Sequence, residues 1–245
     1  MSGHEQGGGG SLVLLPGFMC DADLWTEVTP LLAPGWNVVH GDLFHDDTIP
    51  AMAARVLAAA PERFVAVGFS MGGFVAREMA LRAPGRVRGL ALIATSAMGN
   101  PPERVARNRA RRERIASAPF RGLSRSDLRR ALHPARRDDE ALVERMLAMG
   151  ARLGKAVLLR QLALEREDGH DGLPGIRCPT LVVAGESDEL RPRVETDRLA
   201  AGIPSARHEI VRDCGHMVPM ERPEALAALL NDWLARELPE PRDGG

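Results

Sequence analysis

The feature that most constrains the fold of this chain is an apolar segment that runs directly into a serine and a pair of glycines. Residues 64–69 read FVAVGF, which has the length and composition of a buried strand. Ser70 follows at once, and beyond Gly72 and Gly73 the residues from 74 to 82 have a helical pattern. A chain that passes from strand to helix without a loop must turn sharply at Ser70, and small neighbouring residues leave room for that turn.

Apolar runs of strand length alternate with helical patterns on both sides of this turn. The predicted strands are 12–15, 38–43, 64–69, 87–95, 180–184 and 207–211. The predicted helices are 49–60, 74–82, 193–201 and a closing helix from Pro223, a residue suited to the first turn. This alternation is typical of an α/β fold with a mostly parallel central sheet and helices on both faces.

The alternation stops between residues 99 and 175, where no strand is convincing. Four helical segments are predicted there, at 103–116, 126–132, 139–152 and 155–167. We therefore expect an all-helical insertion at 99–175 that divides a core made of 12–98 and 176–238. Residues 1–11, MSGHEQGGGGS, contain four consecutive glycines and are expected to form a flexible lead-in.

Composition narrows the classes of partner. The 245 residues are enough for one large domain with a hydrophobic core, and a net charge of -1 creates no field that would attract nucleic acid. No apolar run is long enough to span a membrane, and the first residues do not resemble a signal peptide. The three cysteines, Cys20, Cys178 and Cys214, have no metal-binding spacing. We expect a cytoplasmic protein that needs no metal or cofactor. The sequence leaves the oligomeric state open.

Ser70 is the predicted nucleophile. It lies in Gly68-Phe69-Ser70-Met71-Gly72, a GxSxG sequence that is a weak signal alone but a strong one at a strand-to-helix junction. Gly68 and Gly72 let the strand and the helix approach each other, so the turn lifts the serine hydroxyl above the sheet. A serine hydroxyl needs a base to take its proton, and a carboxylate orients that base.

His216 and Asp188 are the predicted base and carboxylate. Each lies in a loop after a predicted strand, Asp188 in GESD and His216 in DCGHMVP. The carboxyl ends of parallel strands meet at one edge of a sheet, where α/β proteins place their sites. Glu186 and Asp213 are alternative carboxylates because they are close in sequence. The other histidines lie in the lead-in, in the insertion, in or beside strands, or before the serine: His4, His133, His170, His40, His208 and His45.

Two backbone amides are expected to stabilise the oxyanion of the reaction. Met71 N–H follows the nucleophile at the start of a helix, whose dipole favours negative charge. Phe18 N–H follows Pro16-Gly17 after the first strand, and Gly17 lets the backbone turn inward. The alternative is a plain Pro-Gly turn.

These motifs resemble the α/β-hydrolase superfamily from about residue 12 to residue 238. The likeness rests on the turn at Ser70, the loop of Asp188, the segment GHMVPMERP around His216, and the order of the three. It implies that Ser70 attacks the substrate, that His216 shuttles the proton and that Asp188 orients His216. It also implies that the insertion covers the site as a cap. The family often has His-Gly where this chain has Pro16-Gly17, and small carboxylesterases with a PGF-type loop are the most similar members.

The resemblance implies hydrolysis of a small carboxylic ester through an acyl-enzyme. A thioesterase, a lactonase or a cofactor-free perhydrolase would use the same three residues, and a non-catalytic small-molecule-binding module is an alternative of another class.

Two further features bear on the substrate. Met19, Trp25, Met98 and Met217 are next to motif loops, where they could form a pliable acyl pocket or simply fill the core. From 98 to 137 there are twelve arginines against three acids. This excess could attract a small acyl group on an acidic carrier, although a solvated helical face explains it better.

Overall fold

The computed structural model describes residues 10–238, so most of the predicted lead-in, residues 1–9, and the last residues, 239–245, lie outside the described part. Six strands form one parallel sheet in the order β2-β1-β3-β4-β5-β6. They are β1 (Ser11–Leu15), β2 (Asn37–His40), β3 (Phe64–Phe69), β4 (Val87–Ile93), β5 (Thr180–Gly185) and β6 (Ala206–Val211). The predicted parallel α/β sheet is confirmed.

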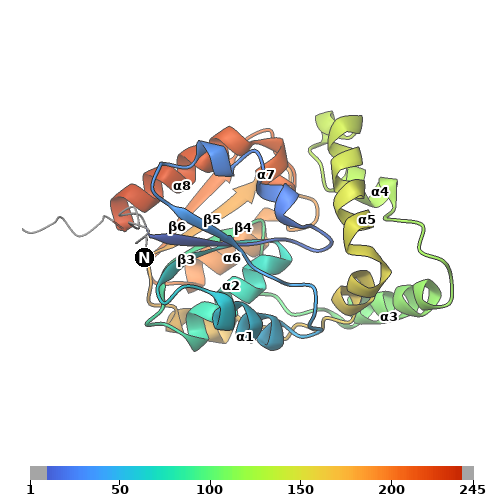
Figure 1. Ribbon diagram of the computed structural model, residues 1–245, viewed down its shortest axis with the longest axis horizontal. Helices are drawn as coiled ribbons and strands as arrows, with labels where there is room; N and C mark the ends of the chain where they lie inside the picture. Colours follow the sequence, from blue (N-terminus) through green and yellow to red (C-terminus); the bar gives the residue numbers. More distant parts are fainter. Residues whose placement is uncertain (1–9, 239–245) are drawn as a thin grey trace, which may run out of the picture.

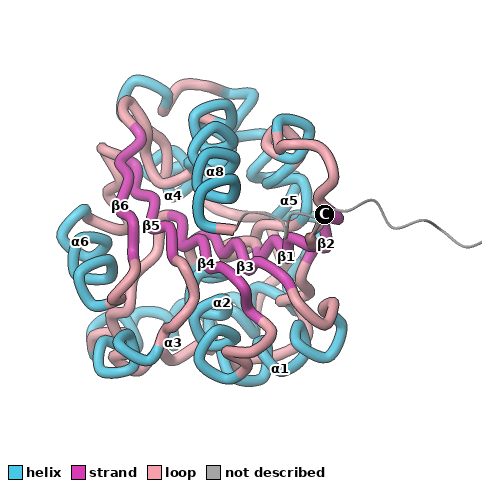
Figure 2. Tube along the Cα trace, turned by 90° about the vertical axis from the view of Figure 1, so that its left-hand side faces the viewer, coloured by secondary structure: helices cyan, strands magenta, loops and turns pink. Residues whose placement is uncertain are grey.

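Helices cover both faces of this sheet. They are α1 (Ile49–Ala59), α2 (Met71–Arg82), α6 (Arg193–Gly202) and α8 (Pro223–Glu237). Figures 1 and 2 show α8 on one face and α1 and α2 on the other. Within β1, Leu12 and Leu14 pack into the core on the α8 side, whereas Val13 and Leu15 pack with α1 and α2. Because successive side chains point to opposite faces and both faces are covered, the inner strands β1, β3, β4 and β5 are mostly apolar, whereas the edge strands β2 and β6 also carry polar, partly exposed residues.

The segment between β4 and β5 forms a helical insertion. Its helices are α3 (Pro102–Ala116), α4 (Arg125–Arg130) and α5 (Glu140–Leu162), with short 3-10 turns at Pro134–Arg136 and His170–Gly175. Figure 1 shows the three helices beyond the carboxyl ends of the strands. The two roots of the insertion lie together, because the Asn100 amide donates to Arg166 O at 2.7 Å. Within residues 10–238, no helix is both long and apolar enough to span a bilayer.

Several element boundaries differ from the sequence prediction. The break in α5 is at Gly154, with φ 73° and ψ −174°, between the two helices predicted at 139–152 and 155–167. The second part ends at Leu162 rather than at residue 167, because Leu164 O and Arg166 O accept hydrogen bonds from Asn100 instead. β2 ends at His40 rather than at residue 43, and the chain packs closely against Leu15 at the next residue, Gly41.

The remaining differences concern short elements. α2 begins at Met71, three residues before the predicted start, and β4 ends at Ile93. The 3-10 helices η1 (Ala22–Trp25) and η2 (Thr29–Leu31) and the short helix α7 (Val218–Glu221) were not predicted. One helical turn is too short to show a hydrophobic period.

Close backbone packing holds the turn between β3 and α2. Ser70 has φ 51° and ψ −109°, a region that non-glycine residues rarely adopt. A Cβ atom on Gly68 would lie 2.5 Å from Gly72 O, and one on Gly72 would lie 2.3 Å from Leu15 O. Thr95 Oγ1 donates to Ser70 O at 2.7 Å. The strand and the helix therefore meet directly only because these positions lack side chains.

Replacing Gly72 by alanine tests this packing. The new methyl group meets backbone oxygens that cannot rotate away, so we expect Gly72→Ala to lower the free energy of unfolding by about 3 kcal/mol. Gly85→Ala is the matched control, because a Cβ there meets nothing within 4 Å. Urea unfolding monitored by fluorescence measures both. Equal midpoints for the two variants would contradict the close packing.

Candidate active site

Ser70, Asp188 and His216 converge at the carboxyl edge of the sheet. Ser70 follows β3, Asp188 follows β5, and His216 lies in the loop after β6. His216 Nε2 lies 2.9 Å from Ser70 Oγ, and His216 Nδ1 lies 2.7 Å from Asp188 Oδ2. The three residues are 8%, 7% and 6% exposed in that order along the chain. The structure thus brings together all three residues that the sequence singled out.

Asp188 is held in place by backbone donors. Its Oδ1 accepts the amides of Leu190 and Arg191, each at 2.8 Å, which leaves Oδ2 directed at the imidazole. The two alternative carboxylates lie elsewhere, since Glu186 and Asp213 are exposed and Glu186 Oε2 accepts the Asp213 amide. Asp188 is therefore the carboxylate that contacts His216.

Glu221 organises the His216 loop, and the sequence reasoning missed it. Its Oε1 accepts the amides of Gly215 at 3.0 Å and Met217 at 3.2 Å, and its Oε2 accepts the amide of His133 at 2.7 Å. Burial raises the pKa of the Glu221 carboxyl, although these backbone donors oppose the shift. The only signal was an acidic residue in an otherwise apolar turn, VPME.

The helical insertion also supports the His216 loop. The His216 amide donates to Ala131 O, just beyond α4, at 2.8 Å. A Cβ on Gly215 would lie 2.4 Å from His133 N, so the two backbones touch. The loop that carries the imidazole is thus packed between the core and the insertion.

The two amides predicted as oxyanion donors lie at the turn of Ser70 and in the loop that packs against it. Met71 is the first residue of α2, so its N–H has no partner within the helix. The loop of Phe18 lies against this turn, because a Cβ on Gly17 would lie 2.7 Å from the Phe69 ring and 3.5 Å from Ser70 Cβ. An anion near Ser70 Oγ would also meet the positive end of the α2 dipole.

Gln161 braces the Phe18 loop from the insertion. This side chain of α5 is 3% exposed, accepts the Met19 amide at 2.8 Å and donates to Leu43 O at 3.3 Å. Met19 has φ 54°, so this loop is held in an unfavourable conformation. The sequence signal was a single polar residue on a buried helix face, and it was not recognised.

The four residues predicted for an acyl pocket fall in three different packing environments, and the pocket stays a prediction. Met19 is buried against Val157, Leu158 and Leu162 of α5. Trp25 and Met217 belong instead to the core cluster that includes α8. Met98 is partly exposed near the start of the insertion. Of the four, Met19 packs against the insertion beside the Phe18 loop.

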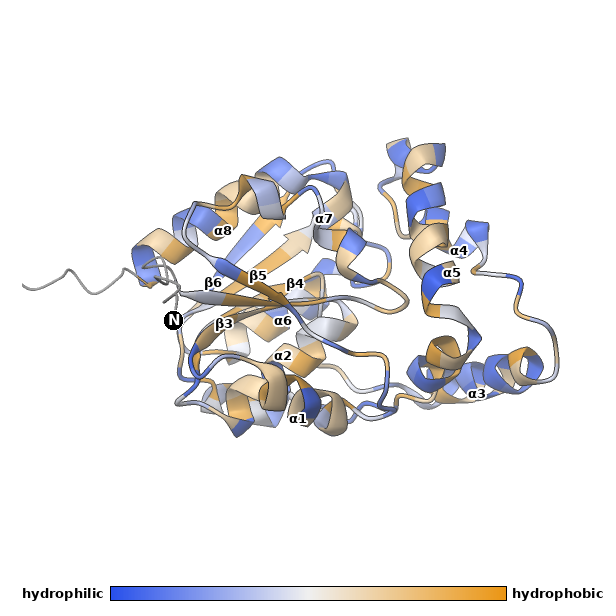
Figure 3. Cartoon of the chain, viewed as in Figure 1, coloured by the Kyte–Doolittle hydropathy of each residue, from blue (hydrophilic) through white to orange (hydrophobic). Residues whose placement is uncertain are grey.

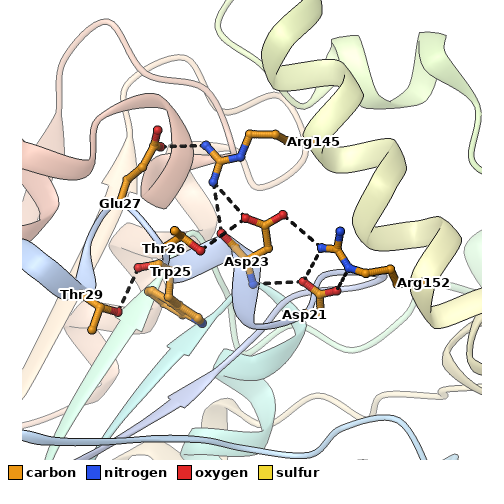
Figure 4. Close-up of polar contacts among 8 residues, drawn as sticks. All are labelled: Asp21, Asp23, Trp25, Thr26, Glu27, Thr29, Arg145 and Arg152. Carbon is orange, nitrogen blue, oxygen red and sulfur yellow. Dashed lines mark hydrogen bonds and ion pairs between the residues drawn. The ribbon is translucent and has the colours of Figure 1, made fainter.

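A second set of contacts ties the insertion to the core through η1. Figure 4 shows Arg145 and Arg152 of α5 reaching Asp21, Asp23 and Glu27. Arg152 binds Asp21 Oδ2 at 2.7 Å and Asp23 Oδ2 at 3.0 Å. Burial raises the pKa of Asp23, but Arg152 and Arg145 lower it overall. These groups are partly exposed, so their ion pairs contribute modestly to stability.

Comparisons with known proteins agree with this architecture. The sequence model described as "Alpha/beta hydrolase family" matches residues 12–229. Pimeloyl-(acyl-carrier protein) methyl ester esterases from Aromatoleum aromaticum and Edwardsiella ictaluri are 30% and 31% identical, over 90% and 91% of this chain and 96% and 92% of theirs. A solved thermophilic esterase from Thermogutta terrifontis is similar with a TM-score of 0.83 and 28% identity, covering 92% of this chain and 89% of that chain. The chain therefore belongs to the alpha/beta hydrolase family and is related to ester-cleaving enzymes.

Proposed function

We propose that this protein hydrolyses carboxylic esters through an acyl-enzyme on Ser70. The observation that carries the proposal is the hydrogen-bonded series from Ser70 Oγ through His216 to Asp188, with distances of 2.9 Å and 2.7 Å. A serine held by a buried imidazole–carboxylate pair is the arrangement that activates a hydroxyl for attack on an acyl carbon. The esterase relatives described above support the same bond type.

The geometry suits a two-step reaction. Ser70 Oγ attacks the ester carbonyl carbon while His216 Nε2 takes the hydroxyl proton, and Asp188 stabilises the imidazolium. His216 then gives this proton to the departing alkoxide, which leaves as an alcohol. A water molecule attacks the acyl-enzyme with His216 again as the base, and the acid and the free Ser70 hydroxyl are released. In both steps the Phe18 and Met71 amides stabilise the oxyanion.

The helical insertion at 99–175 is the proposed cap over this centre. It contributes Gln161 to the Phe18 loop and Ala131 O to the His216 loop. Ser70 is 8% exposed, and we expect a substrate to reach it between the insertion and the carboxyl edge of the sheet.

Removal of the proposed nucleophile or base gives the first test. A fluorophosphonate probe should label Ser70 in the wild-type protein, and Ser70→Ala should abolish labelling. His216→Ala should lower kcat on p-nitrophenyl esters by at least about 1,000-fold, because the members of such a group act as a unit. His45→Ala, a side chain that is 60% exposed, is the control and should keep wild-type rates. An unlabelled wild-type protein would contradict the proposal.

Gln161 gives a second test, as a positioning residue. Gln161→Leu removes the acceptor of the Met19 amide, so the Phe18 loop can shift, and kcat should fall roughly tenfold with little change in KM. Gln161→Glu keeps an acceptor for the Met19 amide but loses the donor to Leu43 O, so it should recover only part of the loss. A purely structural role would lower stability in both variants without this difference in kcat, so steady-state kinetics and thermal melts are both needed.

A carrier-borne acyl ester is the substrate class favoured by a specific observation. The curated relatives named above act, by their names, on an ester attached to acyl-carrier protein. Figure 3 shows hydrophilic residues recurring along α3, which buries none of its side chains. Arg107, Arg112 and Arg114 are exposed and form no ion pair within residues 10–238. An acidic carrier could dock on these charges.

Charge reversal on α3 tests this substrate class. The double variant Arg107→Glu and Arg112→Glu should raise KM for a methyl ester on acyl-carrier protein about tenfold and leave p-nitrophenyl acetate unaffected. Arg63→Glu, an exposed change before β3 and away from the insertion, is the control. High salt should shrink the difference between variant and wild type. Equal KM values in all three proteins would exclude docking on α3.

The same three residues would also serve a thioesterase, a lactonase or a perhydrolase. A panel of esters, thioesters, lactones and peracid assays with the wild-type protein separates these activities. A protein that binds these compounds without turnover would be a binding module.

A further inference from the structure

Three arginines surround the ring of Phe74, and their guanidinium groups have no role in the site described above. The guanidinium carbons of Arg166, Arg77 and Arg191 lie 4.4 Å, 5.2 Å and 6.0 Å from the ring centroid. They come from three separate segments, namely the chain after α5, helix α2 and the loop that follows Asp188. Phe74 itself is 2% exposed and lies one helical turn beyond Ser70. The aromatic face attracts each cation but does not neutralise it.

Arg77 and Arg191 are buried and Arg166 is half-buried, with part of their hydrogen-bonding capacity unused. Arg77 and Arg191 are 9% and 8% exposed. Within residues 10–238, the Nε atoms of Arg166 and Arg191 are buried and have no hydrogen-bond partner. The bonds that the other nitrogens make go to neutral carbonyls, from Arg77 Nη1 to Ser96 O at 3.4 Å and from Arg191 Nη1 to Leu190 O at 3.0 Å. Buried polar groups are seldom left without partners.

Within residues 10–238, no carboxylate forms an ion pair shorter than 4.0 Å with these three arginines, although the charges of Glu195 and Asp188 act to raise the pKa of Arg191 against the effect of its burial. Arg77 and Arg166 form no ion pair there, and the one pair of Arg191, with Glu195, is 4.0 Å long. The two acidic residues near Arg77 pair with other side chains. Glu78 pairs with Arg82 at 2.5 Å, and Asp168 pairs with His170 at 2.7 Å.

The cations also repel one another. Burial, followed by the charges of Arg191, Arg104 and Arg77, lowers the pKa of Arg166 to about 9. Arg104, on α3, therefore adds a fourth positive charge to the same region. Buried like charges are costly unless a counter-charge accompanies them.

We propose that Arg77, Arg166 and Arg191 form a binding site for an oxyanion, either a carboxylate or a phosphate group. Guanidinium groups present paired N–H donors in the spacing of two such oxygens, which a single ammonium group cannot match. The unused Nε donors of Arg166 and Arg191 would form directed hydrogen bonds to the oxyanion, and the three positive charges would supply most of the binding energy. Anion binding at this site can be tested whether or not the ester hydrolysis proposed above takes place.

The position of the site couples the helical insertion to the core. Arg77 and Arg191 belong to the core, whereas Arg166 belongs to the last residues of the insertion, where Arg166 O accepts the Asn100 amide. The Arg191 amide donates to Asp188 Oδ1 at 2.8 Å. An oxyanion held by all three arginines would therefore fasten the root of the insertion next to the loop of Asp188.

Thermal melts in inorganic phosphate test the site. At matched ionic strength, phosphate in place of chloride should raise the Tm of the wild-type protein saturably by about 4 °C. Arg166→Met and, as a second variant, Arg191→Met should lose this rise. In chloride they should melt no lower than the wild type, because removing one of several like charges relieves repulsion. Arg63→Met, an exposed arginine before β3, should keep the full rise. No phosphate-specific rise in the wild type, or an equal rise in the Arg166 and Arg191 variants, would overturn the proposal.

Steady-state kinetics with two related esters identify whether the oxyanion belongs to the substrate or is a free ion. Monomethyl and dimethyl esters of the same dicarboxylic acid differ by one free carboxylate. If Arg166→Met raises KM for the monomethyl ester alone, the site holds a carboxylate of the substrate. If both KM values are unchanged while the phosphate response is lost, the site holds a free oxyanion. If the wild type hydrolyses neither ester, the ester-hydrolase proposal fails while the melts still decide the anion site.

Discussion

The contact on which the rest of the structure depends is the close approach of α2 to β1 and β3 at Gly68 and Gly72. It allows a helix to begin at the residue after Ser70, so the serine is forced to φ 51° and its hydroxyl leaves the plane of the sheet. The same contact makes Met71 the first residue of α2, so its amide has no partner within the helix. The parallel arrangement then brings the loops after β5 and β6 to the same edge, where Asp188 and His216 reach Ser70.

Much of this could be predicted, because it depends on local patterns and on one geometric rule. Apolar strands alternating with helices identify a parallel sheet, and residues that follow such strands share an edge. Glu221 and Gln161 were not predicted, since each also bonds a partner far away in sequence, His133 at 88 residues and Met19 at 142 residues. The packing of the four expected pocket residues, of which Trp25 and Met217 share one core cluster and Met19 belongs to another, could not be predicted for a related reason. Closeness to a motif in sequence does not determine which side of the sheet a side chain reaches.

The arginines of the insertion divide into groups that sequence alone does not distinguish. Arg125 and Arg129 are paired with acids at the start of α5 and stabilise the insertion itself. Arg107, Arg112 and Arg114 are directed to solvent on α3. Arg166, outside the basic segment, lies against Phe74 with two arginines of the core. Arginines thus brace the insertion, form an exposed basic face on α3, or join a cationic cluster around Phe74. The residues that surround each arginine in the fold determine which of these roles it has.

The hydrogen bond from the His216 amide to Ala131 O has a consequence for how such proteins can diversify. A helical insertion between two strands suggests a separate unit that could be exchanged between relatives to change substrate specificity. Here the stretch around residues 131–133 is as much a part of the histidine loop as its own flanking residues. A hybrid made by transplanting a foreign insertion at its two roots would lose that support. Variation is therefore freer in α3 and in the outer part of α5 than in the chain that joins α4 to α5.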